Sequence, residues 1–406
     1  MQITHVESFL FNPGSTRNLL FCRIETESGL HGWGEAYVTA EKEKAVDEYL
    51  RAMAPHLIGR DACNIRHTGQ VLFDDFVIRR SSLGFLSAWS AIEMAMWDIV
   101  GKQAGMPVHN LLGGASRERV RVYANGWADE PGTLEQTIER ALAVKAQGYT
   151  ALKFDPLPGP WRNFIHREDE EFAVNFVRLM REALGPEMEI LIEMHRRLAP
   201  SHAVRLGRRL AEFDIAWYEE PCLSDNIDLV AEVRRSQPIP VVTGETIYTK
   251  EAFAQVFEKR AADIINPDIC AMGGITALMD VAVMAQPHSV AVAPHNNNST
   301  LAGLAATVHV CATIPNFTIA ECFVNRLTAC DEIALASVKV EAGWAEVPKT
   351  PGLGIDIDVD RLRGHPYKAY PPKGLRQYWE EFPRRHYTIP AILQGAGGVE
   401  STGRQK

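Results

Sequence analysis

The sequence of 406 residues predicts an α/β protein: a (β/α)8 TIM barrel, or its modified (β/α)7β form, preceded by a smaller α+β domain. Two observations carry this prediction. Near residue 117 the pattern changes from alternating strands and long helices to short apolar runs separated by helical stretches. Eight such runs follow over about 200 residues, and this rhythm is typical of a barrel built from strand–helix units.

The first domain, residues 1–117, begins with strands. Apolar and polar residues alternate over 2–11, and the segment LLFCRIETESG leads directly into HGWGEAY. These segments predict antiparallel strands joined by a glycine-containing turn. The helical spacing of apolar residues then predicts helices over 41–53 and 86–104, the second ended by a glycine and a proline.

The second domain, residues 118–325, holds the strands of the predicted barrel. A doubly wound open sheet is the rival fold, but it would show a glycine-rich phosphate turn after its first strand, and VYANGW is not one. The segment 326–406 contains the Gly- and Pro-rich stretch GWAEVPKTPGLGIDID and is expected to return to the first domain. The predicted strands are Val120–Tyr123, Ala151–Phe154, Glu189–Ile192, Ala216–Tyr218, Ile239–Val242, Asp263–Ile265, Val290–Ala293 and Thr318–Ala320.

Composition and charge limit the class of function. Hydrophobic residues make up 46% and charged residues 23%, as in ordinary globular proteins, and the net charge of −9 disfavours nucleic acid or an anionic membrane as partner. The seven cysteines form no CxxC pair, and neither a signal peptide nor an apolar run of 18 residues is present, so we expect a cytoplasmic protein with reduced thiols. An anionic substrate would need a local positive charge, such as a bound cation.

Polar side chains follow almost every predicted barrel strand. Such strand ends gather at the face of a barrel where chemistry takes place. Chance would place a charged residue after many strands, because loops are polar, but hardly after seven in succession. The strand ends are Lys153-Phe154-Asp155, Glu193-Met194-His195, Glu219-Glu220-Pro221, Gly244-Glu245, Asn266-Pro267-Asp268, Pro294-His295-Asn296 and Glu321.

Three of these carboxylates are evenly spaced. Glu193, Glu219 and Glu245 follow one another at intervals of 26 residues, about the length of one strand–helix unit. They would therefore lie at the tips of three adjacent strands, where their mutual repulsion favours a hard divalent cation. Each glutamate alone would indicate a surface salt bridge. The three together predict a metal site, and oxygen-only ligands favour Mg²⁺ over Zn²⁺.

Candidate bases lie on both sides of the predicted metal. A metal of this kind can bind a carboxylate substrate and stabilise the enediolate that forms when the α-proton is removed. Lys153 precedes the metal strands, and His295 follows them with Asp268 on the neighbouring strand, where it could fix the imidazole tautomer. His195 comes two residues after Glu193, so strand alternation would place both on one face, although a solvated loop histidine accounts for that position about equally well.

Taken together, these residues resemble the enolase superfamily, in particular its mandelate racemase branch, over essentially the whole chain. The resemblance rests on Lys-x-Asp in the second strand, Glu193, WYEEP, GE, INPD, APHN and Glu321, in that order, together with LLGG and PGLGIDI. Within the branch, ANGW, ALKFDP and IEMHRR are most similar to the dehydratases of sugar acids such as gluconate, galactonate or arabinonate.

The resemblance implies a fold, a cofactor and a set of roles. The first domain would cap the barrel mouth and read the distal hydroxyls of a sugar acid, and the protein would assemble as a homo-oligomer. Mg²⁺ would be bound by Glu193, Glu219 and Glu245. His295, paired with Asp268, would take the C2 proton, His195 would protonate the departing 3-hydroxyl, and Glu321 and Lys153 would lie near the substrate carboxylate. Asp155, Asn125 and Trp33 are the expected substrate-binding residues.

Two departures from the branch bear on the reaction. Glu193 stands where Asp is commoner, and Asp155 stands where the racemases have a second Lys, so that Asp155 would hold Lys153 charged. This favours elimination over two-base racemisation. An epimerase, a racemase or a lactone cycloisomerase remains the alternative on the same scaffold. A metal-independent glycosidase using Glu219 or Glu220, and a homologue that only binds a sugar acid, are the other hypotheses.

Overall fold

The computed structural model describes residues 1–15, 17–129, 132–157, 159, 162–297, 299–372 and 374–375. The chain divides into two compact units, the first comprising Met1–Ala124 and Val242–Ala369, the second Asn125–Val241 and Tyr370–Lys406. The domain limits predicted from the sequence, 1–117, 118–325 and 326–406, stay predictions. Residues 376–406 of the last segment lie outside the described residues.

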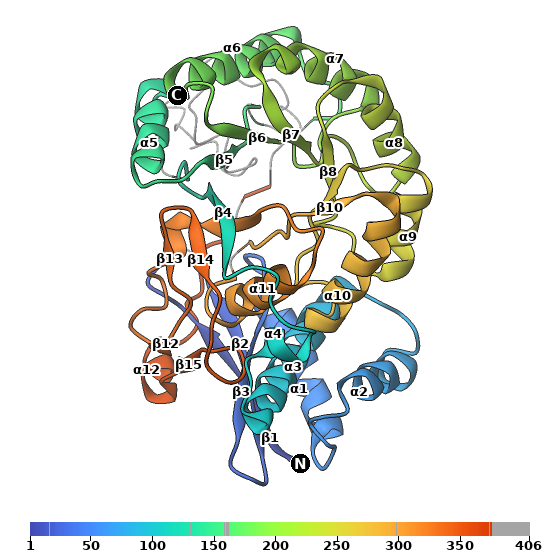
Figure 1. Cartoon of the computed structure of the whole chain (residues 1–406), viewed down its shortest axis with the longest axis vertical. Helices are drawn as coiled ribbons and strands as arrows, with labels where there is room; N and C mark the ends of the chain where they lie inside the picture. Colours follow the sequence, from blue (N-terminus) through green and yellow to red (C-terminus); the bar gives the residue numbers. More distant parts are fainter. Residues whose placement is uncertain are drawn as a thin grey trace, which may run out of the picture. The chain divides into compact units, whose positions relative to one another are not determined.

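The first unit combines two segments that are far apart in the sequence, Met1–Ala124 and Val242–Ala369 (Figure 1). Its N-terminal part contains β1 (Ile3–Phe11), β2 (Leu19–Thr26), β3 (His31–Ala36), α1 (Glu43–Leu57), α2 (Ile65–Val71), η1 (Leu72–Phe76), α3 (Leu83–Ala104), α4 (Val108–Leu111) and β4 (Arg119–Asn125). Its second part contains β8 (Val241–Thr243), α9 (Lys250–Glu258), β9 (Ile264–Ile265), α10 (Gly274–Ala285), η3 (Gln286–His288), β10 (Ala291–Val292), α11 (Ala302–Thr313), β11 (Ala320–Phe323), η4 (Val324–Arg326), β12 (Ala334–Ala336), β13 (Val340–Glu341), β14 (Trp344–Glu346), β15 (Asp356–Ile357) and α12 (Val359–Gly364).

An antiparallel sheet, β1-β2-β3, packs against the long helix α3. The helix begins at Ser82, whose hydroxyl accepts the N–H of Phe85, and ends at Gly105 in the left-handed conformation. Gly34 lets β3 approach the helix, because a Cβ at this position would collide with the backbone of Ala91. The strands and the helix predicted over 86–104 are therefore confirmed.

The core helix α3 is also the one described helix that is long and apolar enough to cross a membrane. Of its most apolar stretch, 72% is buried inside the structure, because the helix is apolar on all sides and is covered by β3, α1 and α10. Its hydrophobicity is accounted for by this packing.

The C-terminal part of the first unit joins the N-terminal strands. The N–H of Asn12 donates to the carbonyl of His365 at 3.0 Å, and Arg363 donates to Glu7. Leu353, in the PGLGIDI segment, donates its N–H to Asp98 of α3 at 2.8 Å. These contacts are those expected of a segment that returns to the N-terminal domain.

Parallel strands in the first unit carry one group of the predicted site residues. β9 pairs in parallel with β8 and with β10, in a register that aligns Thr243 with Ile265 and Ile265 with Val292. Beyond these strands, Asp268 and His295 form an isolated parallel bridge. The residues after β9 and β10 are therefore neighbours in space.

The second unit is a strand–helix repeat in which β5, β6 and β7 are parallel (Figure 1). Its short strands are almost wholly buried, as in a sheet covered by helices, and they match the predicted apolar runs within two residues. The elements are α5 (Leu134–Ala146), β5 (Ala151–Phe154), α6 (Arg167–Leu184), β6 (Glu189–Glu193), α7 (Pro200–Leu210), η2 (Ala211–Phe213), β7 (Ile215–Glu219) and α8 (Ile227–Ser236).

Two buried histidines pack together between α4 and α11 in the first unit. The rings of His109 and His309 stack with centroids 5.2 Å apart, and Nε2 of His309 lies 3.1 Å from the carbonyl oxygen of Leu353. Burial lowers the pKa of His309 to about 4. The ring therefore stays neutral in the fold at pH values at which an exposed histidine is charged.

This pair predicts a loss of stability in mild acid. Between pH 6.5 and 4 the unfolded chain binds a proton at His309 that the folded chain does not bind, so the free energy of unfolding falls as the pH falls. The loss is at most about 1.4 kcal/mol per pH unit. Urea unfolding across this window should show a shallower pH slope for His309→Gln than for the wild type. Equal slopes would contradict the assignment.

Candidate active site

The ends of β5, β6 and β7 bring a lysine and two glutamates together in the second unit. The register of β6 and β7 aligns Glu193 with Glu219. Nζ of Lys153 lies 2.5 Å from Oε1 of Glu219 and 3.6 Å from Oε2 of Glu193, and all three side chains are buried. Burying two neighbouring carboxylates is costly unless positive charge compensates them, and the ammonium group supplies part of that charge.

Next to this cluster, His195 is held by a buried carboxylate. Nδ1 of His195 lies 2.8 Å from Oδ2 of Asp155, and 30% of the histidine side chain is exposed. The hydrogen bond fixes the orientation of the ring. The structure therefore supports the interpretation of His195 as a site residue over that of a solvated loop histidine.

Asp155 has a different environment from the one the sequence predicts. Its carboxylate is buried and accepts from Arg197, from His195 and from the N–H of Leu157. The expectation that Asp155 holds Lys153 charged is wrong, because Lys153 pairs with the glutamates instead. The carboxylate is held by these buried partners and orients His195, so its direct contact with a substrate stays a prediction.

The turn after β6 explains how His195 reaches Asp155. The prediction for His195 rested on the alternation of side chains along a strand. The strand β6 ends at Glu193, so this alternation no longer applies at His195. His195 and Arg196 have φ angles of 49° and 62°, in the left-handed region that is unfavourable for such side chains. The N–H of His195 donates to Oε1 of Glu193 at 2.6 Å. Strain of this kind gathers at functional sites, where the surroundings hold it.

In the first unit, the loops after β8, β9, β10 and the strand β11 surround His295. Nδ1 of His295 lies 2.7 Å from Oδ2 of Asp268. Its Nε2 lies 3.3 Å from Oε2 of Glu245 and 3.7 Å from Oε2 of Glu321. The predicted pairing of His295 with Asp268 is thus present in the structure, with both side chains buried.

The charges around His295 change its acid–base behaviour. Burial lowers the pKa of His295, but the charges of Glu245, Glu321 and Asp268 outweigh this and raise it to about 9. Burial also raises the pKa of Asp268, against the stabilising hydrogen bond from His295. At neutral pH the ring is therefore mostly protonated among these carboxylates, and it must lose this proton before it can act as a base.

The two other predicted substrate-binding residues differ in their environment. Trp33 is fully buried, packs against Phe9 and donates its indole N–H to Asp356 at 3.0 Å. No part of its side chain is left for a ligand, so the prediction of a substrate contact at Trp33 is wrong. Asn125 is half-buried at the end of β4 and accepts the N–H of Gly126 at 2.7 Å, and its role in binding stays a prediction.

Sequence reasoning missed two residues at these sites. Arg197 is buried against Asp155 and also donates to the carbonyl of Met194, and burial lowers its pKa to about 9. Its position in IEMHRR, two residues after His195, could have suggested a role. The ring of Tyr37 lies 6.5 Å from that of His295. Burial, and then the charges of Asp268 and Glu245, raise the pKa of Tyr37, so it keeps its phenol O–H.

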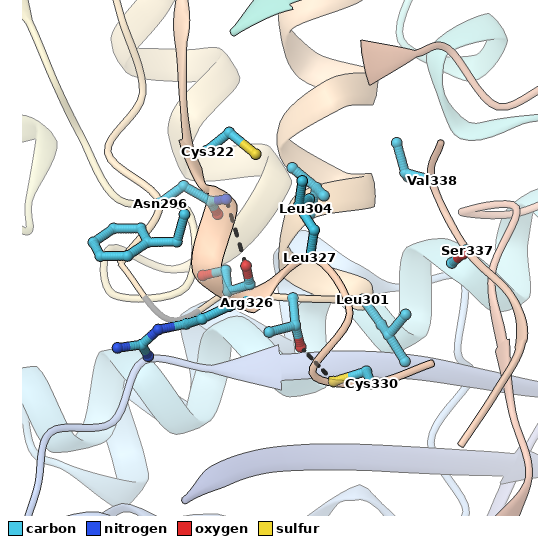
Figure 2. Close-up of a pocket in the computed structure, with 12 residues that line it drawn as sticks. Asn296, Leu301, Leu304, Cys322, Arg326, Leu327, Cys330, Ser337 and Val338 are labelled. Atoms are coloured by element: carbon cyan, nitrogen blue, oxygen red, sulfur yellow. Dashed lines mark hydrogen bonds between the residues drawn. The ribbon is translucent and has the colours of Figure 1, made fainter. Parts of the chain in front are cut away.

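A small pocket lies behind the loop that follows His295 (Figure 2). Asn296, Thr300, Cys322 and Cys330 are among the residues that line it, and its volume is about 30 Å³. That is room for one or two water molecules, whereas small-molecule sites occupy hundreds of Å³. This pocket is therefore too small for a sugar acid.

Two models of known protein families match this chain. Residues 136–361 match the family described as enolase C-terminal domain-like, and residues 10–113 match the N-terminal domain of mandelate racemase / muconate lactonizing enzyme. The chain belongs to the mandelate racemase and muconate lactonizing enzyme family of the enolase superfamily. Its fold is the superfamily's N-terminal capping domain with a C-terminal barrel-like α/β domain, which confirms the predicted fold class and the resemblance.

Relatives within the enolase superfamily cover nearly the whole chain. A D-galactonate dehydratase family member from Streptomyces bingchenggensis is 32% identical over 92% of this chain and 96% of its own. A D-galactarolactone cycloisomerase from Agrobacterium fabrum is 32% identical over 89% of this chain and 98% of its own. The crystal structure of mandelate racemase/muconate lactonizing enzyme from Sulfitobacter sp. matches 91% of this chain and 96% of its own with a TM-score of 0.84 and 32% identity.

The pairing of Asp155 with Arg197 makes a prediction about stability. Asp155→Asn leaves the buried guanidinium without its counter-charge, so the free energy of unfolding should fall by about 3–5 kcal/mol. Urea unfolding measures this loss. Glu171→Gln is the control, because it removes an exposed carboxylate from Arg209 and should change the stability little. Equal effects of the two substitutions would contradict the role of Asp155.

Proposed function

We propose that this enolase-superfamily protein is a Mg²⁺-dependent sugar-acid dehydratase, a hydro-lyase that removes the C2 proton of an aldonate or aldarate and eliminates the 3-hydroxyl. The observation that carries the proposal is the matching arrangement of two histidines. His195 and His295 are each hydrogen-bonded through Nδ1 to a buried aspartate, at 2.8 and 2.7 Å. One oriented imidazole suits a general acid and the other a general base, which elimination of water requires.

The donor set fits the proposed cation. Glu193, Glu219 and Glu245 each offer one carboxylate oxygen as a ligand, and an all-oxygen anionic set favours Mg²⁺ over softer metals. The ammonium group of Lys153 forms ion pairs with Glu193 and Glu219, as expected of buried carboxylates that require a neighbouring positive charge. When bound, Mg²⁺ would supply charge that stabilises the enediolate form of the substrate carboxylate.

The side chains of this protein divide the reaction between them. His295 takes the C2 proton on Nε2, and its Nδ1 stays bound to Asp268, which stabilises the imidazolium that forms. The electron pair released from the C2–H bond first moves onto the carboxylate as the enediolate. It then forms the C2–C3 double bond as the C3–O bond breaks. His195 gives its proton to the departing hydroxyl, which leaves as water. The enol product then tautomerises to a 2-keto-3-deoxy sugar acid.

Lys153 has an electrostatic role in this scheme. Its ammonium group is 2.5 Å from Glu219, so it is held as a cation and supplies charge near the substrate carboxylate. A two-base racemase needs a second base on the other face of C2, and a lysine bound to carboxylates is poorly suited to this. Glu321, whose Oε2 accepts the N–H of Asn296 at 2.9 Å, is held in place to face the same intermediate.

An isomerase that forms the same enediolate is the second candidate. The relative named as a D-galactarolactone cycloisomerase is as similar in sequence as the galactonate dehydratase relative. Such an enzyme would also abstract a C2 proton, but it would release no water. His195 with Asp155 favours the dehydratase, because elimination requires an oriented acid for the 3-hydroxyl.

We further propose that the protein is cytoplasmic, that it acts as a homo-oligomer, and that residues 1–117 form its capping domain.

Turnover of sugar acids tests the proposal directly. The protein with Mg²⁺ should convert at least one member of a set of aldonates and aldarates to a 2-keto-3-deoxy acid, detected with semicarbazide. EDTA should abolish the reaction, because without the cation the substrate carboxylate lacks its charge partner, and added Mg²⁺ should restore it. Absence of turnover with every sugar acid would refute the dehydratase, and activity that survives EDTA would favour a metal-independent reaction.

An isotope experiment should distinguish the roles of the two histidines. In deuterated water, His195→Asn should abolish elimination but leave exchange of the C2 proton measurable, because His295 still acts as base. His295→Asn should remove both, and each loss should reach about 100-fold or more. Nuclear magnetic resonance of the recovered substrate measures the exchange. If exchange in His195→Asn disappears as completely as elimination, His195 is not the acid.

A further inference from the structure

The two helices that follow the His295 and Asp268 loops both begin without a cap of their own. α10 starts after Gly273, and α11 starts after Leu301, and neither residue provides a side-chain hydrogen bond to the first turn. The first N–H groups of a helix need acceptors when they are buried. In this protein, the acceptors come from side chains of the N-terminal part of the chain.

Glu93, on α3, caps helix α10. Its buried carboxylate accepts the N–H of Ile275 at 2.8 Å and that of Thr276 at 2.9 Å, together with the indole N–H of Trp97 at 2.8 Å. Gly274 makes room for it, because a Cβ there would collide with the carboxylate. The loop from Asp268 to this helix is therefore fastened to α3.

Glu35, on β3, caps helix α11 in the same way. Its buried carboxylate accepts the N–H of Thr300 at 2.9 Å, the hydroxyl of Thr300 at 2.9 Å and the N–H of Gly303 at 3.0 Å. Cys330 in turn donates to the hydroxyl of Thr300, as drawn in Figure 2. Thr300 is only five residues after His295, so Glu35 holds the far end of the loop that carries the base.

We propose that Glu35 and Glu93 are positioning residues for the His295–Asp268 pair. The catalytic consequence of this positioning rests on the proposed function. The Nδ1–Oδ2 distance of 2.7 Å depends on two separate loops, and each carboxylate fastens one of them. Hydrogen bonds from N–H groups to a charged carboxylate at a helix N-terminus are stronger than neutral ones. Two caps from the N-terminal part of the chain therefore set the geometry of the base.

Asp98 provides a matched control from the same part of the chain. It is also a fully buried carboxylate on α3, and it accepts the N–H of Trp33 at 3.0 Å and that of Leu353 at 2.8 Å. Neither partner belongs to the loops that carry the pair. Asp98 also pairs with Lys102 at 2.8 Å, so Asp98→Asn removes an ion pair as well as a buried carboxylate, without releasing a catalytic loop.

Hydrogen exchange of the full-length protein tests the positioning without relying on turnover. Glu35→Gln should speed exchange at Thr300 and Gly303 by about tenfold or more and leave Ile275 and Thr276 unchanged, and Glu93→Gln should do the reverse. Asp98→Asn should affect neither pair of amides. If Glu35→Gln and Glu93→Gln each speed exchange at all four amides alike, or if Asp98→Asn speeds exchange at these amides as much, the proposal is overturned. Thr300→Ala, which removes one hydrogen bond to Glu35, is the milder variant should Glu35→Gln fail to fold.

Kinetics then test the consequence for the base. Glu35→Gln and Glu93→Gln should lower kcat by about 10- to 100-fold and change KM little, because a misplaced base slows proton abstraction more than binding. Asp98→Asn should keep kcat near the wild-type value. Unchanged kcat in both Gln variants would refute the positioning role. If wild-type protein turns over no sugar acid but the selective exchange pattern appears, the dehydratase proposal fails and the loop positioning stands.

Discussion

The burial of carboxylates is the constraint on which this structure depends. Glu193, Glu219, Asp268 and Glu321 all lie on or just after strands inside the protein, where a charge is costly unless a partner compensates it. Each has such a partner in Lys153, His295 or a backbone N–H. The side chains of the candidate site are therefore held by charge and hydrogen bonding, which is a precondition for acting on a bound anion.

This compensation is organised differently in the two units. In the second unit, two cations compensate the buried carboxylates, because Lys153 pairs with the glutamates and Arg197 pairs with Asp155. In the first unit, His295 is surrounded by three carboxylates, and its basicity rises in consequence. A histidine oriented by a carboxylate next to a buried arginine suits proton donation, and one among carboxylates suits proton acceptance. The difference in surroundings gives two chemically similar histidines opposite roles in the proposed reaction.

Local sequence patterns predicted the strands well and the side-chain partners less well. β5 was predicted residue for residue as Ala151–Phe154, because a short apolar run between two helical stretches is typical of a buried parallel strand. The pairing of His295 with Asp268 followed from their interval of one strand–helix unit. The partner of Asp155 did not follow, because β5 ends at Phe154 and alternation stops there. Trp33 was assigned wrongly because one of its partners in the folded chain, Asp356, is distant in sequence.

In the N-terminal part of the chain, two buried carboxylates contact the helices α10 and α11. A capping domain that only recognised substrate would need few buried charges, because recognition is the work of its surface loops. Here Glu35 and Glu93 are buried beneath that surface, where burial raises the pKa of each carboxyl to about 7. Keeping two carboxylates there is costly, and their hydrogen bonds run to the helices behind the His295 and Asp268 loops. In the proposed positioning of the base, this cost is offset by the hydrogen bonds that fasten the two loops.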